Sequence, residues 1–140
     1  MRAGPDVNVY VSAFINPAGS PGRVLAGGHD GRVTLCISEG IMADLAGVLT
    51  RPHDVRALGW PTGAVADALR NLRDLALMVE PAIVQAVATD PDDDVVLGTA
   101  IAAHADDVIS GDRHPLDLGV YRDIQIVTPR QFVAMLDGAT

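Results

Sequence analysis

The chain has 140 residues, of which 49% are apolar and 20% charged, a composition typical of a globular protein and not of a disordered one. Its net charge of −8 argues against a protein that coats nucleic acid by broad neutralisation of phosphates. All ten basic residues are arginine and the only cysteine is Cys36, which excludes a P-loop, a Schiff-base lysine and an internal disulfide. We expect a single domain over residues 1–140 and a cytoplasmic location, because neither a membrane span nor a signal-peptide core is present.

The first residues carry conflicting signals. The stretch VNVYVSAF (7–14) alternates between apolar and polar residues like a strand. The preceding RAGPD (2–6) is a poor strand, because Pro5 has no N–H to donate to a sheet. Periodicity alone therefore leaves the start of the first strand open.

Strand-like and helix-like stretches then alternate. The residues RVTLCIS (32–38) read as a buried strand, and 39–50 read as a helix. We predict a second helix over 62–79 and a short strand or extended link over 82–87. Such alternation predicts an α/β fold with a mostly parallel sheet.

The last third of the chain continues this pattern. Residues 94–105 read as a helix, and 106–110 and 123–128 as strands. The closing TPRQFVAML (128–136) has a clear helix start: Thr128 as N-cap, proline at the first helical position and glutamine completing a capping box.

The acidic run DPDDD (90–94) precedes the third predicted helix. Asp90 suits an N-cap and Pro91 the first helical position. Asp93 precedes apolar residues by three, four and seven positions, which places it in the middle of the apolar stripe, whereas Asp92 and Asp94 lie near its edges. One acid of this run is therefore expected to face inward.

Three further acids can join Asp93. Asp44 lies at the edge of the apolar face of its helix, Asp112 follows a strand through a single glycine, and Asp6 lies near the end of the first strand. Ligands of open α/β sheets bind at the carboxyl ends of the strands, so all four acids can converge on one crevice. Clustered carboxylates repel one another, and divalent cations such as Mg²⁺ or Mn²⁺ relieve that repulsion. Each acid alone also fits an ordinary helix start, surface position or turn.

Four segments resemble, in order, those of the PIN-domain family, and cover nearly the whole chain. The similarity is strongest to its bacterial branch of toxins from toxin–antitoxin systems, related to the VapC-type ribonucleases. The segments are DVNVYVSAFINPAGSPGRVL, ISEGIMADLAGVLTRP, DPDDDVVLGTAIAAHADDVISGDRHPLDL and IQIVTPRQFVAML. The resemblance implies a three-layer Rossmann-like fold with a mostly parallel central sheet flanked by helices.

The resemblance also implies Mg²⁺- or Mn²⁺-dependent cleavage of RNA, neutralisation by a cognate antitoxin and, in many members, a homodimer. Metal ligands would be Asp6, Asp93 and Asp112, with Asn8 and Ser110 as supporting residues. The implied catalytic acids are Asp6, Asp44, Asp93 and Asp112.

Three residues or segments depart from the family pattern. Val7 replaces the usual threonine, and Asp44 is one methylene shorter than the usual glutamate. The resemblance makes residues 2–6 a central strand and 7–14 the start of a helix, and Gly4-Pro5 is expected to weaken or shorten that strand. These departures motivate an alternative, a catalytically weak PIN-like domain that acts by binding a protein. A nuclease that cleaves DNA at the same site also remains open.

Overall fold

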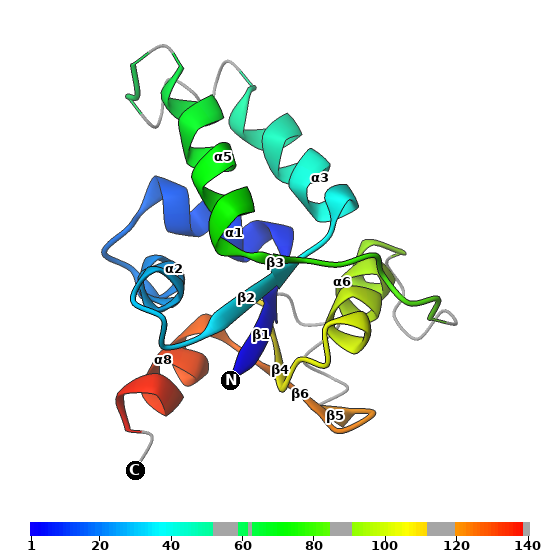
Figure 1. Ribbon diagram of the computed structural model, residues 1–140. Helices are drawn as coiled ribbons and strands as arrows, with labels where there is room; N and C mark the ends of the chain where they lie inside the picture. Colours follow the sequence, from blue (N-terminus) through cyan, green and yellow to red (C-terminus); the bar gives the residue numbers. More distant parts are fainter. Residues whose placement is uncertain (52–58, 62, 85–90, 112–119, 139–140) are drawn as a thin grey trace.

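The computed structural model describes residues 1–51, 59–61, 63–84, 91–111 and 120–138, with the backbone alone for 91–93. Its centre is a six-stranded sheet in the order β3-β2-β1-β4-β6-β5 (Figure 1). Every neighbouring pair is parallel except β5–β6. The strands are β1 (Arg2–Pro5), β2 (Thr34–Ile37), β3 (Leu77–Met78), β4 (Asp107–Ile109), β5 (Val120–Tyr121) and β6 (Ile124–Val127).

Helices cover both faces of the sheet and make three layers. On one face α1, α2 and α8 pack together, and on the other α6 packs against β1, β2 and β4 (Figure 1). The helix α3 packs against α1, α5 and α6. The predicted Rossmann-like α/β fold is thereby confirmed. The helices are α1 (Val7–Ile15), α2 (Ser20–His29), α3 (Glu39–Leu49), α5 (Ala64–Leu75), α6 (Pro91–Ala102) and α8 (Pro129–Asp137).

The N-terminal segment forms a strand and then a helix. Residues 2–5 are the strand β1, which lies at the centre of the sheet between β2 and β4 in spite of its proline. The stretch 7–14, which alternates like a strand, belongs to α1, so that interpretation is wrong. Its buried residues Val9, Tyr10 and Ala13 follow helical spacing.

The predicted helix over 62–79 is too long at its C-terminal end. It ends at Leu75, and the next residues form the edge strand β3, where the Val79 N–H donates to the Ile37 carbonyl at 2.9 Å. The apolar residues Leu77 and Met78 fit a helical stripe as well as a strand, because a two-residue strand is too short to show the strand period.

No strand forms over residues 82–84 of the predicted 82–87, and the remainder lies outside the described residues. Instead, the Ala82 N–H donates to the Gly98 carbonyl within α6 at 2.9 Å. A Cβ at residue 98 would lie 2.3 Å from the Ala82 carbonyl oxygen, so glycine alone permits this approach.

The other predicted elements match the structure within a few residues. The helix α6 begins at Pro91, which confirms the predicted first helical position and lies three residues before the start read from periodicity at residue 94. It ends three residues before the predicted 105. The capping box of Thr128 and Gln131 at the start of α8 is confirmed. The helix α2 and the short strand β5 were not predicted. Within the described residues, no helix is both long and apolar enough to span a membrane.

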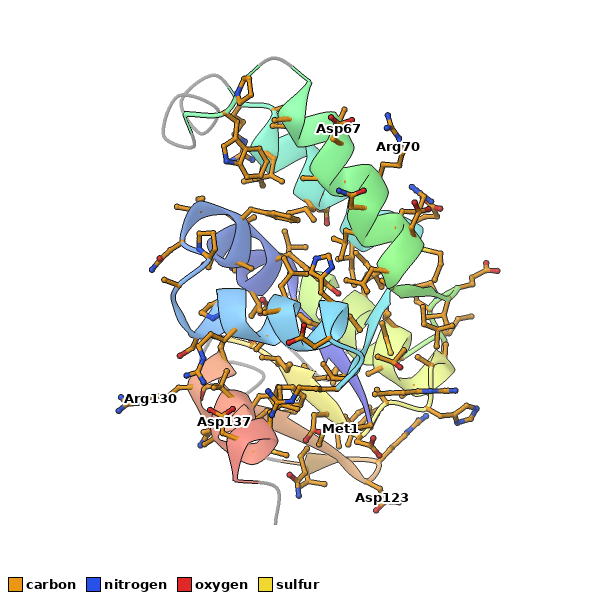
Figure 2. All side chains as sticks on the ribbon, turned by 60° about the vertical axis from the view of Figure 1, so that its left-hand side comes forward. Met1, Asp67, Arg70, Asp123, Arg130 and Asp137 are labelled. Carbon is orange, nitrogen blue, oxygen red and sulfur yellow. The ribbon has the colours of Figure 1, made fainter. Side chains whose placement is uncertain are left out.

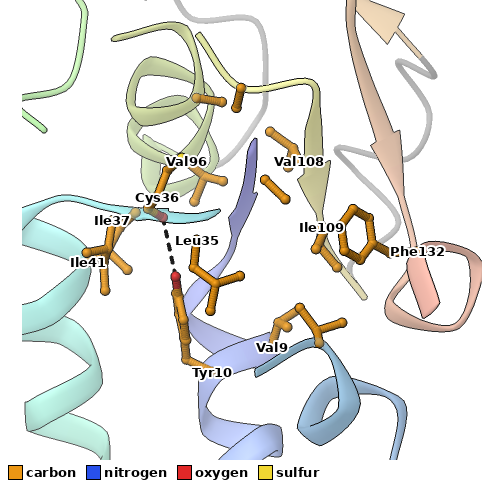
Figure 3. Close-up of a cluster of buried hydrophobic side chains, with 14 of the residues drawn as sticks. Val9, Tyr10, Leu35, Cys36, Ile37, Ile41, Val96, Val108, Ile109 and Phe132 are labelled. Atoms are coloured by element: carbon orange, nitrogen blue, oxygen red, sulfur yellow. Dashed lines mark hydrogen bonds between the residues drawn. The ribbon is translucent and has the colours of Figure 1, made fainter. Parts of the chain in front are cut away.

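The core lies on both faces of the sheet. Tyr10 of α1 and Phe132 of α8 are the largest fully buried side chains, and they pack with aliphatic side chains of β2 and β4 (Figure 3). Val96 and Leu97 of α6 cover the opposite face. This packing fixes the strands whose ends carry the candidate site.

Candidate active site

Four neighbouring strands end at the same edge of the sheet, and a polar residue directly follows each of them. These residues are Asp6 after β1, Ser38 after β2, Ser110 after β4 and Thr128 after β6. Three of them cap the next helix: the side chains of Asp6, Ser38 and Thr128 accept from the backbone N–H three positions later, at 2.9, 3.3 and 3.1 Å. The edge is therefore lined by oriented oxygen atoms.

Asp6 and Ser110 meet at the centre of this edge. The Ser110 hydroxyl donates to Oδ2 of Asp6 at 2.6 Å, while Oδ1 accepts from the Val9 N–H. Asp6 is 5% exposed and Ser110 is fully buried. The Asp6 N–H also donates to the Ile109 carbonyl at 3.0 Å, which ties the two strand ends together. The carboxylate of Asp6 is thus held in one orientation.

This pair lies at the topological switch point of the sheet. The chain continues from β1 to β2 on one side, and from β4 to β6 on the other. Open α/β sheets bind their ligands in the crevice that such a reversal creates at the carboxyl ends of the strands. The position of Asp6 and Ser110 therefore suits a ligand site.

The helix α6 brings the acidic run to the same edge. Residues 103–106 connect the end of α6 to the start of β4, so α6 runs antiparallel to β4, against which it packs (Figure 1). The first turn of α6, which contains Asp93, therefore lies at the edge where β4 ends. The predicted apolar stripe is confirmed, because Val96, Leu97 and Ala100 are all buried.

Of the other predicted site residues, the structure describes the side chains of Asp44 and Asn8, and both are exposed. Asp44 is exposed on α3, roughly 9 Å along the helix axis from Ser38. Asn8 is exposed in the first turn of α1. Asp112 and the side chain of Asp93 lie outside the described residues. Among the side chains that the structure describes, no three His, Cys, Asp or Glu residues are grouped as a metal site, so the four-acid cluster stays a prediction.

Sequence reasoning missed Ser38 and Tyr10. Ser38 is fully buried at the end of β2, and the signal for it was a serine directly between an apolar strand and a helix. Tyr10 is 1% exposed, and its hydroxyl donates to the Cys36 carbonyl at 3.3 Å (Figure 3). Burial, reinforced by the nearby Cys36 and the negative charge of Asp6, raises the pKa of Tyr10, which keeps the hydroxyl a donor.

A Rossmann-like sheet with a buried, oriented carboxylate at its switch point defines an open α/β domain with its candidate ligand site at the carboxyl ends of the strands. Residues 5–114 match the family model of the PIN domain, and the chain belongs to the PIN-domain family. The matched range includes all four predicted acids. A search of curated proteins finds no match. PIN domains share a nuclease-type fold, are generally hydrolases and typically use divalent metal ions.

Proposed function

We propose that this PIN domain is a metal-dependent endoribonuclease that hydrolyses RNA phosphodiester bonds. The observation that carries the proposal is the buried carboxylate of Asp6, held by Ser110 at the switch point of the sheet. A buried carboxylate is costly unless cations or hydrogen-bond donors stabilise its charge. Its position at the switch point, where open α/β sheets bind their ligands, favours a role in catalysis over a purely structural one.

Asp6, Asp93 and Asp112 would hold Mg²⁺ or Mn²⁺, and Asp44 would complete the acidic cluster. Carboxylate oxygen atoms are the ligands that both ions prefer, so the chemistry of these donors fits the metal. Such an ion, when bound, activates water and stabilises negative charge on a phosphodiester. The Ser110 hydroxyl holds the Asp6 carboxylate in one orientation, as partners of metal ligands do.

The test is an RNA cleavage assay with purified protein and Mn²⁺ or Mg²⁺. We expect cleavage that a chelator abolishes and that Asp93→Asn reduces strongly. A DNA strand of the same sequence, offered in competition, separates an RNA-directed from a DNA-directed nuclease. Metal-dependent cleavage that persists undiminished in Asp93→Asn would falsify the assignment of the site.

We further propose that the protein is the toxin of a type II toxin–antitoxin pair, with an antitoxin encoded alongside. One surface feature supports a protein partner: a groove of about 420 Å³ between α3 and α5. Its apolar lining comes from Met42, Ala43, Ala46 and Leu69. Arg73 of α5 pairs with Glu39 of α3 across the groove. Arg70 pairs with Asp67 on the exposed surface of α5 (Figure 2).

The same groove supports the alternative function, a catalytically weak domain that acts through protein binding. Calorimetry with Mn²⁺ and with the product of the neighbouring gene separates the two. A toxin binds both, whereas a purely protein-binding domain binds only the partner. We expect Leu69→Glu to weaken the complex and to leave Mn²⁺ binding intact, with Arg130→Ala on α8 as the matched surface control. Size-exclusion chromatography of the protein alone tests whether it forms a homodimer.

A further inference from the structure

The strand β1 contains a proline at a position where the sheet requires a donor. Backbone groups of a parallel strand point alternately to its two neighbours. The Arg2 carbonyl and the Asp6 N–H both bond to the β4 side, and the Met1 carbonyl accepts from Thr34 N–H on the β2 side. By this alternation the nitrogen of Pro5 faces β2.

The acceptor that Pro5 leaves without a ladder bond is the Cys36 carbonyl. In this sheet the N–H of a residue donates to the carbonyl of the residue that is paired with the preceding position of its own strand. Pro5 pairs with Ile109, and the N–H of the next residue, Asp6, donates to the Ile109 carbonyl. Ala3 pairs with Leu35, so continuing the register by one residue places Cys36 opposite Gly4. Residue 5 would then donate to the Cys36 carbonyl, and proline cannot.

The Tyr10 hydroxyl donates to that carbonyl (Figure 3). Cys36 is fully buried, so water cannot take this place, and an unpaired buried carbonyl is destabilising. Tyr10 therefore supplies from α1 the hydrogen bond that Pro5 removes from β1.

The hydrogen bond from the Tyr10 hydroxyl also affects Asp6, which lies between Pro5 and Tyr10 in the sequence. The Tyr10 N–H donates to the Asp6 carbonyl at 3.3 Å, closing the first turn of the helix that Asp6 caps. Ser110 holds Asp6 from the β4 side, and the Tyr10 side chain fixes the same turn against β2. We propose that Tyr10 is a positioning residue, which replaces the missing Pro5 donor and sets the Asp6 carboxylate between β2 and β4. The positioning role rests on the proposed function of Asp6 as a metal ligand.

A double-mutant cycle on the full chain tests the proposal, with Tyr10→Phe, Pro5→Ala and the combination. Phenylalanine keeps the ring and removes only the donor, while alanine restores an N–H at residue 5. We expect Tyr10→Phe alone to lower Tm by about 5 °C and to weaken Mn²⁺ binding about tenfold. In the Pro5→Ala background the same change should lower Tm by less than about 2 °C and leave Mn²⁺ affinity nearly unchanged, because coupling is confined to groups that share a partner. The control is Tyr121→Phe on β5, three strands from β1, which should leave Mn²⁺ affinity unchanged.

If Tyr10→Phe lowers Tm equally in the wild-type and the Pro5→Ala protein, the Tyr10 hydroxyl does not replace the missing donor of Pro5. A lowered Tm with unchanged Mn²⁺ affinity would overturn the positioning role and leave a purely structural one. If Tyr10→Phe alone does not fold, a folded Pro5→Ala/Tyr10→Phe protein is the expected rescue, and failure of both contradicts it. A wild-type protein that binds no Mn²⁺ would overturn the proposed function and the positioning role with it, while the thermal coupling still decides the replacement.

Discussion

The Asp6 carboxylate and the Ser110 hydroxyl are 104 residues apart in the sequence and 2.6 Å apart in the structure. The parallel pairing of β1 and β4 brings them together, because each residue directly follows its strand. The contact is buried, so water does not compete for it. A hydroxyl that donates to a carboxylate at this distance makes a strong, charge-assisted hydrogen bond.

We expect Ser110→Ala to weaken Mn²⁺ binding by roughly 10- to 100-fold, the usual effect of removing a residue that orients a metal ligand. Ser110→Thr keeps the hydroxyl and should recover part of the affinity. Isothermal titration with Mn²⁺ measures both variants. Equal affinity of wild type and Ser110→Ala would show that the hydrogen bond does not orient a metal ligand.

The acidic run offers a matched pair of variants. Asp93→Asn is expected to reduce metal-dependent cleavage by at least about 100-fold, because losing a metal ligand costs more than losing a residue that only orients one. Asp94→Asn, one position further along α6, should change it by less than about threefold, since Asp94 lies at the flank of the apolar stripe. Initial rates on a labelled RNA measure both. The reverse order would assign the inward position to Asp94 and move the helix register by one residue.

The buried carboxyl of Asp107, at the start of β4, makes the stability of the fold depend on pH. The residue is 2% exposed, and burial, with a smaller effect of the neighbouring Asp106, raises the pKa of its carboxyl. The folded state then binds a proton at a higher pH than the unfolded chain does, so this group lowers stability at neutral pH. The lost stability is regained as the pH falls through the raised pKa toward 3.8, the ordinary pKa of an aspartate.

Asp107→Asn should therefore raise Tm at pH 7, and the difference from wild type should shrink as the pH approaches 3.8. Thermal unfolding followed by circular dichroism between pH 4 and pH 7 measures this difference. A constant difference across that range would mean that the charge of Asp107 is not its cause.

The capping box of α8 can be tested at Thr128, which lies at the β6 end of the site edge and is not one of the proposed metal ligands. Thr128→Ala removes the side chain that accepts from the Gln131 N–H and should destabilise the fold by about 1 kcal/mol. For a chain of this size, that corresponds to a fall in Tm of roughly 3–5 °C. Thr128→Ser keeps the hydroxyl and serves as the control. Cleavage at 25 °C should be unchanged in both variants.

Much of the fold could be predicted because its elements have strong local signals. The capping box at Thr128 and the proline at residue 91 mark where α8 and α6 begin. The apolar run of β2 gives way to helical spacing at residue 39, where α3 begins. These signals arise within one or two turns of the chain, and a sequence displays them directly.

The N-terminal strand could not be predicted from local pattern, because tertiary contacts override propensity there. Gly4 and Pro5 disfavour a strand, yet pairing on both sides and the bond from the Tyr10 hydroxyl stabilise it. The bond between Asp6 and Ser110 likewise depends on which strands are neighbours, and the spacing of residues does not contain that information. The resemblance to PIN domains supplied the order of the segments and the role of Ser110.

We propose that Asp6, Asp93 and Asp112 hold a divalent metal at the carboxyl ends of β1 and β4. Anomalous diffraction from a crystal soaked in Mn²⁺ tests this placement. We expect manganese with carboxylate oxygen atoms of all three residues at about 2.0–2.2 Å, close to the octahedral distances of Mg²⁺. A crystal with residues 91–112 ordered and no manganese at Asp6 would contradict it.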